Sequence, residues 1–232
     1  MGAMVRAKWS LRQVEDREPA RGRARVLLAD DHVLVAEAFK TLLEPDFEVV
    51  GTVADGRELL RVAAGLRPDV VLVDLNMPLL NGRDAGEQLK QMLPELKIIV
   101  LTMDGNAEVA AAALEKWASG YLLKTSASGE LQKAMNAVLR GEKYVAPSLQ
   151  EALRELPWSN GRAKTKRTPT PRQREVLQLL AEGHTMKEAA GILHVTARTV
   201  AFHKYRIMQE FGIANNAELL RLAIKLKLVN QG

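Results

Sequence analysis

Five short aliphatic runs alternate with stretches of helical spacing between residues 25 and 141, and this alternation restricts the possible folds of the chain more than any other feature. The runs predict β-strands at Val26–Ala29, Glu48–Val53, Val70–Val73, Ile98–Leu101 and Gly120–Leu123. The stretches between and after them predict helices at Val33–Leu43, Gly56–Ala64, Gly82–Met92, Ala107–Trp117 and Ser128–Leu139. Strands rich in Val, Ile and Leu that alternate with helices form parallel sheets covered on both faces. We therefore expect an α/β domain that is a flavodoxin-like, doubly wound, five-stranded parallel sheet.

Polar side chains stand where four of the predicted strands end. Asp30 and Asp31 follow the first strand, and Asp74 follows the third. Thr102 ends the fourth strand, and Lys124 ends the fifth. In a doubly wound sheet, functional groups gather at the carboxyl ends of the strands. Three acids, a hydroxyl and an amine are therefore expected to meet at one edge of the sheet.

This set of groups suits the transfer of a phosphoryl group. Carboxylates such as Asp30 and Asp31 bind a hard cation, and Mg²⁺ is the expected cofactor. Asp74 is placed to attack a phosphoryl group, while Lys124 and Thr102 bind its oxygens. Simpler roles are also open, because Asp31 could cap the following helix and Asp30 could be an ordinary solvated acid.

The C-terminal part of the chain has the opposite charge and predicts only helices. Residues 25–141 carry 12 Lys and Arg against 17 Asp and Glu, whereas residues 146–232 carry 14 against 7. Pro171 follows Thr170 at one predicted helix start, and Gly183 ends that helix. Four short helices with a tight turn at His194–Val195 are typical of a helix-turn-helix. The basic charge suggests that this part is able to bind a polyanion, although basic surfaces can also serve solubility alone.

The chain divides into four parts. We expect an N-terminal extension without regular structure at residues 1–24, the α/β domain at 25–141, a linker at 142–168 and the helical domain at 169–232. The linker contains the basic run RAKTKR and a short helix near Leu149–Leu156. The chain has no cysteine and no apolar run of membrane-spanning length, so we expect a cytoplasmic protein without a membrane partner.

The motifs ADDH, VDLNMP, LT and GYLLK resemble the receiver domain of bacterial two-component response regulators. The basic part resembles the LuxR-type DNA-binding domain, so the chain from Arg25 to Val229 is similar to the NarL/FixJ group. This resemblance implies that a sensor histidine kinase phosphorylates Asp74. It further implies that Asp31, Asp74 and the backbone carbonyl of Asn76 hold Mg²⁺, with Asp30 acting through water.

The resemblance also implies a switch beside the phosphoacceptor. Thr102 and Tyr121 would form a pair in which the aromatic ring turns inward when Thr102 engages the phosphoryl group, and Lys124 would close the site. The alternative for Tyr121 is an exposed ring at a strand edge.

The stretch TARTVAFHKYRIM matches the recognition helix of the LuxR-type domain. Helical spacing assigns Val200, Ile207 and Phe211 to its buried seam. The side chains expected to contact DNA in the major groove lie outside this seam and are Arg198, Thr199, Phe202, Tyr205, Arg206 and Gln209.

Three positions depart from the family pattern and bear on DNA affinity. Ala201 stands where Lys is common, Pro169 stands where Leu usually precedes Thr-Pro, and Tyr205 stands where a basic residue is frequent. The final helix, NNAELLRLAIKLKLV, has more apolar residues than a small domain needs. We expect part of it to pair two copies in a phosphorylated homodimer that binds inverted half-sites.

The chain is thus expected to be a phosphorylation-activated transcriptional regulator and not an enzyme. Phosphorylation would strengthen DNA binding by freeing the recognition helix, by pairing the receivers, or both. One alternative is a LuxR-type regulator that does not depend on phosphorylation. Another is an aspartyl-phosphate phosphatase of the haloacid dehalogenase type, which needs a second acid where Asn76 stands. A third, a flavin-binding module, lacks a phosphate-binding loop after the first strand.

Overall fold

The computed structural model describes residues 22–156 and 168–229. Its N-terminal part is one parallel sheet with the strand order β2-β1-β3-β4-β5-β6. The strands are β1 (Arg25–Ala29), β2 (Glu48–Val53), β3 (Val70–Asp74), β4 (Lys97–Thr102), β5 (Gly120–Leu123) and β6 (Tyr144–Val145). The doubly wound α/β fold expected from the sequence is confirmed. Most of the predicted N-terminal extension and the middle of the predicted linker lie outside the described residues.

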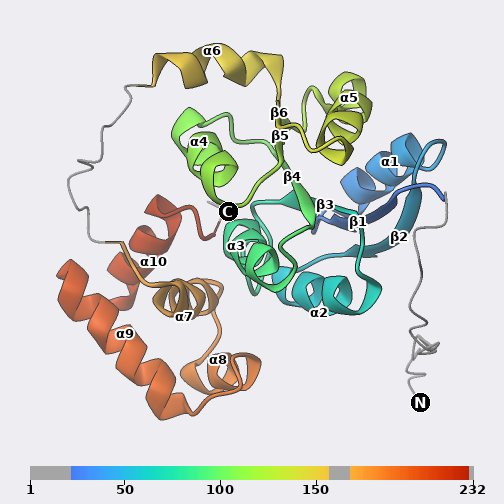
Figure 1. Cartoon of the computed structure of the whole chain (residues 1–232). Helices are drawn as coiled ribbons and strands as arrows, with labels where there is room; N and C mark the ends of the chain where they lie inside the picture. The colour runs from blue at the N-terminus through green and yellow to red at the C-terminus, as the bar shows by residue number, and fades with distance from the viewer. Residues whose placement is uncertain (1–21, 157–167, 230–232) are drawn as a thin grey trace, which may run out of the picture.

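Helices cover both faces of the sheet (Figure 1). Two helices, α1 and α5, lie together on one side, and three, α2 to α4, lie on the other. Their bounds are α1 (Val33–Leu43), α2 (Gly56–Leu66), α3 (Gly82–Met92), α4 (Ala107–Lys116) and α5 (Ala127–Leu139). Polar N-caps fix several starts, since the side chains of Asp55, Asn81 and Asn106 accept backbone N–H bonds at the first turns of α2, α3 and α4.

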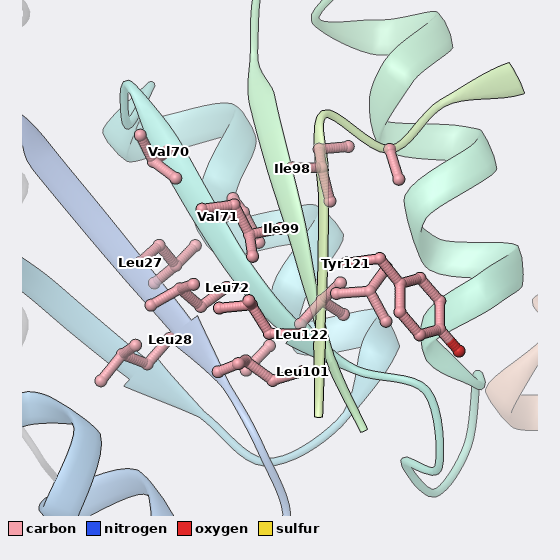
Figure 2. Packing of buried hydrophobic residues seen from close by; sticks show 14 of the residues in the cluster. Leu27, Leu28, Val70, Val71, Leu72, Ile98, Ile99, Leu101, Tyr121 and Leu122 are labelled. Atoms are coloured by element: carbon pink, nitrogen blue, oxygen red, sulfur yellow. The ribbon is translucent and has the colours of Figure 1, made fainter. Parts of the chain in front are cut away.

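The core lies on both faces of the central strands (Figure 2). Every residue of β3 is buried, as expected for a strand that carries helices on each side. Val71, Ile98 and Ile99 are fully buried in this core. Apolar burial of this kind stabilises the fold by about 25 cal/mol per Å². It also makes the carboxyl edge of the sheet a rigid base for the polar residues that follow the strands.

The sixth strand was not predicted, and it changes the expected five-stranded sheet. Tyr144 and Val145 pair with Gly120 and Tyr121 of β5 in parallel register. The helix α6 (Pro147–Glu155) follows directly, and its Leu149 is buried in the core of the α/β domain. The first part of the predicted linker therefore belongs to the α/β domain.

The helical domain consists of α7 (Pro171–Ala181), α8 (Met186–Ile192), α9 (Ala197–Phe211) and α10 (Asn216–Lys225). Capping boxes at Thr170 and Thr185 begin α7 and α8. Helical spacing predicted that Val200, Ile207 and Phe211 form the buried side of α9. Val200 and Ile207 are fully buried, and Phe211 is partly buried. In Figure 1, α7 lies between α9 and α3, so α9 is on the outer side of the molecule.

No helix among residues 22–156 and 168–229 is both long enough and apolar enough to cross a bilayer.

Candidate functional site

The predicted acids and amine meet at the carboxyl edge of the sheet. Asp74 is the last residue of β3, and Thr102 is the last residue of β4. Asp30 directly follows β1, and Lys124 directly follows β5. Because neighbouring parallel strands end at the same edge, residues far apart in the sequence become neighbours here.

Lys124 joins the two buried carboxylates. Its Nζ atom lies 2.7 Å from Asp30 Oδ2 and 3.0 Å from Asp74 Oδ2. The three side chains are only 7%, 6% and 3% exposed. Asp30 Oδ2 has no directed hydrogen bond, so its contact with Lys124 is a charge contact. Two buried carboxylates are thus balanced by one amine, which leaves room for a further positive charge.

The pKa values follow from this arrangement. Burial is the main influence on Asp74 and raises its pKa above the ordinary value, with Lys124 opposing and Asp30 adding to the shift. Burial alone would lower the pKa of Lys124, but its contacts with Asp30 and Asp74 outweigh that effect and raise it. Lys124 therefore stays protonated, and Asp74 is stabilised by any cation that joins the site.

Asp31 lies beside this group but is more exposed. His32, and not Asp31, is the N-cap residue of α1, and its side chain makes no capping bond. The possible role of Asp31 as a helix cap is therefore wrong. Instead, Asp31 Oδ1 lies 2.9 Å from Nδ1 of His32, and the Oδ1 atom of Asp30 accepts the His32 N–H at 3.0 Å.

The arrangement of side chains fits a divalent cation. Ligand atoms of Asp30, Asp31, His32 and Asp74 all lie within 4.8 Å of one another. Three carboxylates are the donors that Mg²⁺ prefers, with water completing its octahedron. His32 was not among the predicted ligands, although its ring directly follows the two acids in the sequence.

The β3–α3 loop, residues 75–81, shapes the space next to Asp74. Asn76 is partly exposed in this loop, two residues after Asp74. The loop closes tightly, because the Gly82 N–H donates to the carbonyl of Leu75 at 2.9 Å. A Cβ atom on Gly82 would lie 1.9 Å from the Asp74 carbonyl oxygen. Only glycine fits at this position while the phosphoacceptor candidate keeps its place.

Thr102 and Tyr121 are both buried, and the side chain of each is hydrogen-bonded to the backbone of Asp104. Thr102 Oγ1 accepts the Asp104 N–H at 3.1 Å, and Tyr121 donates its hydroxyl to the Asp104 carbonyl at 3.3 Å. Tyr121 is fully buried, so the alternative of an exposed ring is wrong. Burial also raises the pKa of its hydroxyl. Asp104, which was not predicted from the sequence, links the two residues of the predicted switch.

The predicted DNA-contacting residues of α9 are accessible for the most part. Phe202 is 55% exposed and Tyr205 is 62% exposed. Arg206 lies over the Phe202 ring, 5.7 Å from its centroid. Arg198 and Gln209 are exposed, whereas Thr199 is partly buried and its hydroxyl lies 2.9 Å from that of Thr196 at the helix start. Thr199 therefore belongs to the capping contact of α9.

The final helix keeps one large apolar side chain in solvent. Leu219 and Ala223 are buried in the helical domain, but Leu220 is 41% exposed. Part of the apolar excess predicted for α10 thus completes the core, and part remains at the surface.

Comparisons with known proteins follow the same division of the chain. Residues 26–136 match the family model of the response regulator receiver domain, and residues 169–223 match that of bacterial regulatory proteins of the luxR family. The oxygen regulatory protein NreC of Staphylococcus aureus is 36% identical over 214 residues, which cover 88% of this chain and 99% of NreC.

Solved structures agree with this match. A structure of RcsB from Salmonella enterica serovar Typhimurium, bound to the promoter P1flhDC with the phosphomimetic BeF₃⁻, is 30% identical. It covers 86% of this chain and 97% of its own, with a TM-score of 0.56. A structure of two RcsB dimers bound to two parallel DNAs is also 30% identical, with the same coverage and a TM-score of 0.55.

Proposed function

The chain belongs to the LuxR family of two-component response regulators and is a transcription factor of that family, and we propose that a sensor histidine kinase controls it by phosphorylating Asp74. The observation that carries this proposal is the buried trio of Asp30, Lys124 and Asp74. Two carboxylates that share one amine at the end of a sheet have no packing function that apolar residues would not serve better.

The chemistry proceeds from Asp74. The phosphoryl group would come from a phosphorylated histidine of the kinase. One carboxylate oxygen of Asp74 forms a bond to its phosphorus while the bond from phosphorus to the histidine nitrogen breaks. The Nζ atom of Lys124 already lies 3.0 Å from Asp74 Oδ2. The ammonium group can therefore bind a phosphoryl oxygen on Asp74 without a large movement. The buried hydroxyl of Thr102 can donate to another phosphoryl oxygen.

Mg²⁺ fits this site as the cofactor. Asp31, Asp74 and the backbone carbonyl of Asn76 would hold the ion, with Asp30 acting through water. When bound, Mg²⁺ neutralises charge on the transferred phosphoryl oxygens. Asp30 and Asp31 serve to hold that positive charge next to Asp74, and burial of the site strengthens the electrostatic attraction.

The phosphatase alternative is disfavoured at one position. Such an enzyme needs an acid two residues after the nucleophile to protonate the leaving group, and Asn76 cannot do so. Regulation that is independent of phosphorylation would leave the buried Asp30 and Asp74 without a purpose. The family is one of DNA-binding regulators, and we propose that the phosphoprotein stores a signal and catalyses no turnover of a substrate.

Double-stranded DNA is the proposed partner of the helical domain. The exposed side chains of Arg198, Phe202, Tyr205, Arg206 and Gln209 would enter the major groove. Leu220 of α10 supports a contact between two copies, and the RcsB dimers bound to DNA support a homodimer on inverted half-sites. Such a regulator would act in the cytoplasm, where it meets chromosomal DNA.

A selection experiment tests the proposed function. Duplexes that bind the protein are selected from a random library after treatment with acetyl phosphate and Mg²⁺. Affinity for the selected duplex is then measured with and without treatment, for the wild-type chain and for Asp74→Ala. We expect treatment to raise wild-type affinity about 5- to 150-fold and to leave Asp74→Ala unchanged. Equal affinities with and without treatment would refute control by phosphorylation.

A further inference from the structure

The surface of the helical domain carries two large aromatic side chains, and both belong to α9. Phe202 and Tyr205 each expose more than half of their surface. Among the described residues of this domain, Leu220 of α10 is the one other exposed large apolar side chain. Apolar side chains that gather on an exposed surface mark a binding site, because their burial against a partner is favourable. The pair on α9 therefore favours a partner that has apolar groups of its own.

The two rings belong to one stripe along α9. Side chains at intervals of three or four residues share one face of a helix. The stripe follows intervals of four, three and four residues and consists of Arg198, Phe202, Tyr205 and Gln209, all of them exposed. Its face is open to solvent, and it is the face proposed to enter the major groove.

The Phe202 ring is held in place by its neighbours on the helix. The guanidinium carbon of Arg206 lies 5.7 Å from the ring centroid. The ring of His203 meets Phe202 edge to face, with the centroids 5.5 Å apart and an interplanar angle of 73°. Arg206 is in turn bonded to Glu210, whose Oε1 accepts from Nε at 3.2 Å and from Nη2 at 3.0 Å. A ring that is already positioned loses little conformational entropy when it binds a partner.

The middle of the stripe cannot read a base through paired hydrogen bonds. The side chain of Phe202 has no donor or acceptor, and Tyr205 has a single hydroxyl at the tip of its ring. Arg206 directs two of its N–H donors to Glu210 and so acts on the Phe202 ring. Bidentate contacts of the kind that Arg makes with guanine and Gln with adenine are therefore confined to the two ends of the stripe, Arg198 and Gln209.

The major groove of DNA offers one apolar group to such rings, the C5-methyl group of thymine. The other groups that the bases present there are hydrogen-bond donors and acceptors. A phenyl ring packed against those groups would leave them without a partner, which costs free energy. Phe202 in the groove therefore favours an A·T base pair and disfavours a G·C base pair.

The spacing of the two rings matches the spacing of base pairs. Phe202 and Tyr205 are three residues apart, which corresponds to about 4.5 Å along the axis of α9. Successive bases of a DNA strand are about 3.4 Å apart along the duplex. The two rings can therefore contact two neighbouring base pairs.

We propose that Phe202 and Tyr205 determine sequence specificity by contacting the methyl groups of thymines in two neighbouring base pairs of each half-site. The inference rests on the proposed function, because it needs α9 in the major groove.

The residues of this face then have different roles. Phe202 and Tyr205 select A·T base pairs by apolar contact, and the Tyr205 hydroxyl at the far end of its ring can keep water or a phosphate as its partner. Arg206 is a positioning residue, because it holds the Phe202 ring. Arg198 contributes charge and hydrogen bonds at the start of the stripe.

Deoxyuridine provides a direct test, because it lacks only the C5-methyl group of thymidine and keeps its base pairing. The probe is a duplex selected from a random library by the full chain after treatment with acetyl phosphate and Mg²⁺. Each thymine is replaced singly by deoxyuridine, and dissociation constants are measured by fluorescence anisotropy at one salt concentration. We expect replacement at either of two neighbouring base pairs in a half-site to weaken wild-type binding about fourfold, since a buried methyl group contributes about 0.8 kcal/mol.

Variants of the stripe assign each methyl contact to a side chain. Phe202→Ala should bind thymine and deoxyuridine equally at one of these base pairs, and Tyr205→Ala should do so at the other. Phe202→Leu keeps an apolar side chain and should keep part of the preference. Arg206→Gln should reduce the preference only at the base pair assigned to Phe202. Arg198→Ala is the matched control, which should bind more weakly overall but retain both preferences.

The possible failures are distinguishable. Equal wild-type affinities for thymine and deoxyuridine at every position would overturn the inference alone. A preference that persists unchanged in both Phe202→Ala and Tyr205→Ala would also overturn it, because the methyl effect would then not depend on these rings. If the protein selects no duplex at all, the proposed DNA binding fails and the inference fails with it.

Discussion

Gly82 lies against the backbone of the phosphoacceptor, and this close approach gives a sharp test of the site's geometry. A methyl group there would overlap the Asp74 carbonyl, so Gly82→Ala should destabilise the fold by on the order of 3 kcal/mol in urea unfolding. Gly65 in α2 has no atom within 4 Å of a built Cβ. Gly65→Ala should therefore stabilise the chain by about 0.5–1 kcal/mol. Similar unfolding midpoints for the two variants would contradict the proposed packing.

Lys124 is the second residue whose removal has a defined consequence. Lys124→Ala leaves Asp30 and Asp74 buried without their amine, which should cost about 3–5 kcal/mol in the presence of a chelator. Mg²⁺ should recover part of this loss, because the ion replaces the missing charge. The variant should still bind Mg²⁺ but should not respond to phosphodonor in DNA binding. Thermal unfolding with and without Mg²⁺ checks the first point, and a normal DNA response would exclude the proposed role of Lys124.

At the scale of single residues, the sequence predicted which side chains meet but not all of their contacts. Asp30, Asp74 and Lys124 could be placed because each one ends an apolar run, and parallel strands end together. The contacts of His32 and Asp104 depend on the path of short loops, which strand periodicity does not determine. Tyr121 was expected to turn inward on phosphorylation, yet its ring is already fully buried and its hydroxyl donates to the Asp104 carbonyl.

Helix α9 has separate buried and exposed sides, which allows its DNA contacts to be tested against a matched arginine. Arg198→Ala should cost about 1–3 kcal/mol on a selected duplex and less on a scrambled one, because a base contact is lost. Arg221→Ala changes an exposed arginine on α10 and should not discriminate between the two duplexes. Titrations at two salt concentrations check both variants. An equal loss on both duplexes would show that Arg198 contacts only phosphate.

Glu182, the C-cap residue of α7, accepts the Leu79 N–H of the β3–α3 loop, so its ionisation should affect how the helical domain docks on the α/β domain. Burial raises the pKa of Glu182 above its ordinary 4.5, although Gln178, the Leu79 N–H, His184 and Arg57 oppose the shift. The docked state therefore binds a proton more tightly than the open state. Docking should strengthen as the pH falls from neutrality and reach its full strength below 4.5.

The chain has no cysteine, so dyes can be attached at Lys133→Cys on α5 and Lys187→Cys on α8, both exposed positions, and energy transfer between them measures this effect. We expect transfer to rise between about pH 7.5 and about pH 5 in the wild-type chain. Glu182→Gln, which resembles the protonated acid, should remove the dependence on Glu182 and stay docked across that range. A pH profile for Glu182→Gln that matches the wild type would assign the effect to other groups.

At the scale of elements, the sequence predicted the long helices and strands with a clear apolar period, but it did not predict the short ones. The bounds of α1 and α3 match the prediction because apolar spacing runs through both helices, and Asn81 also caps the start of α3. Strand β6 has two residues, too few to show any alternation, and only pairing with β5 makes it a strand. The position of Thr199 in the cap of α9 likewise depends on a local contact with Thr196.

For the molecule as a whole, the change of charge along the chain predicted two domains, and the structure contains both. The interface between them could not be predicted, because its partners lie far apart in the sequence. Asn81 and Gln178, for example, are 97 positions apart. Nothing in the local pattern of α7 distinguishes a buried Gln178 from a solvent-exposed glutamine, since its burial depends on a second domain.

The central claim is that Asp74 accepts a phosphoryl group with the help of a divalent cation. The most direct measurement is the intact mass of the full chain after treatment with acetyl phosphate, with Mg²⁺ or with excess chelator. We predict that the wild-type chain gains the mass of one phosphoryl group with Mg²⁺ and little with chelator, and that Asp74→Ala gains none. A phosphoryl group on Asp74→Ala, or full modification of the wild type in chelator, would contradict this account.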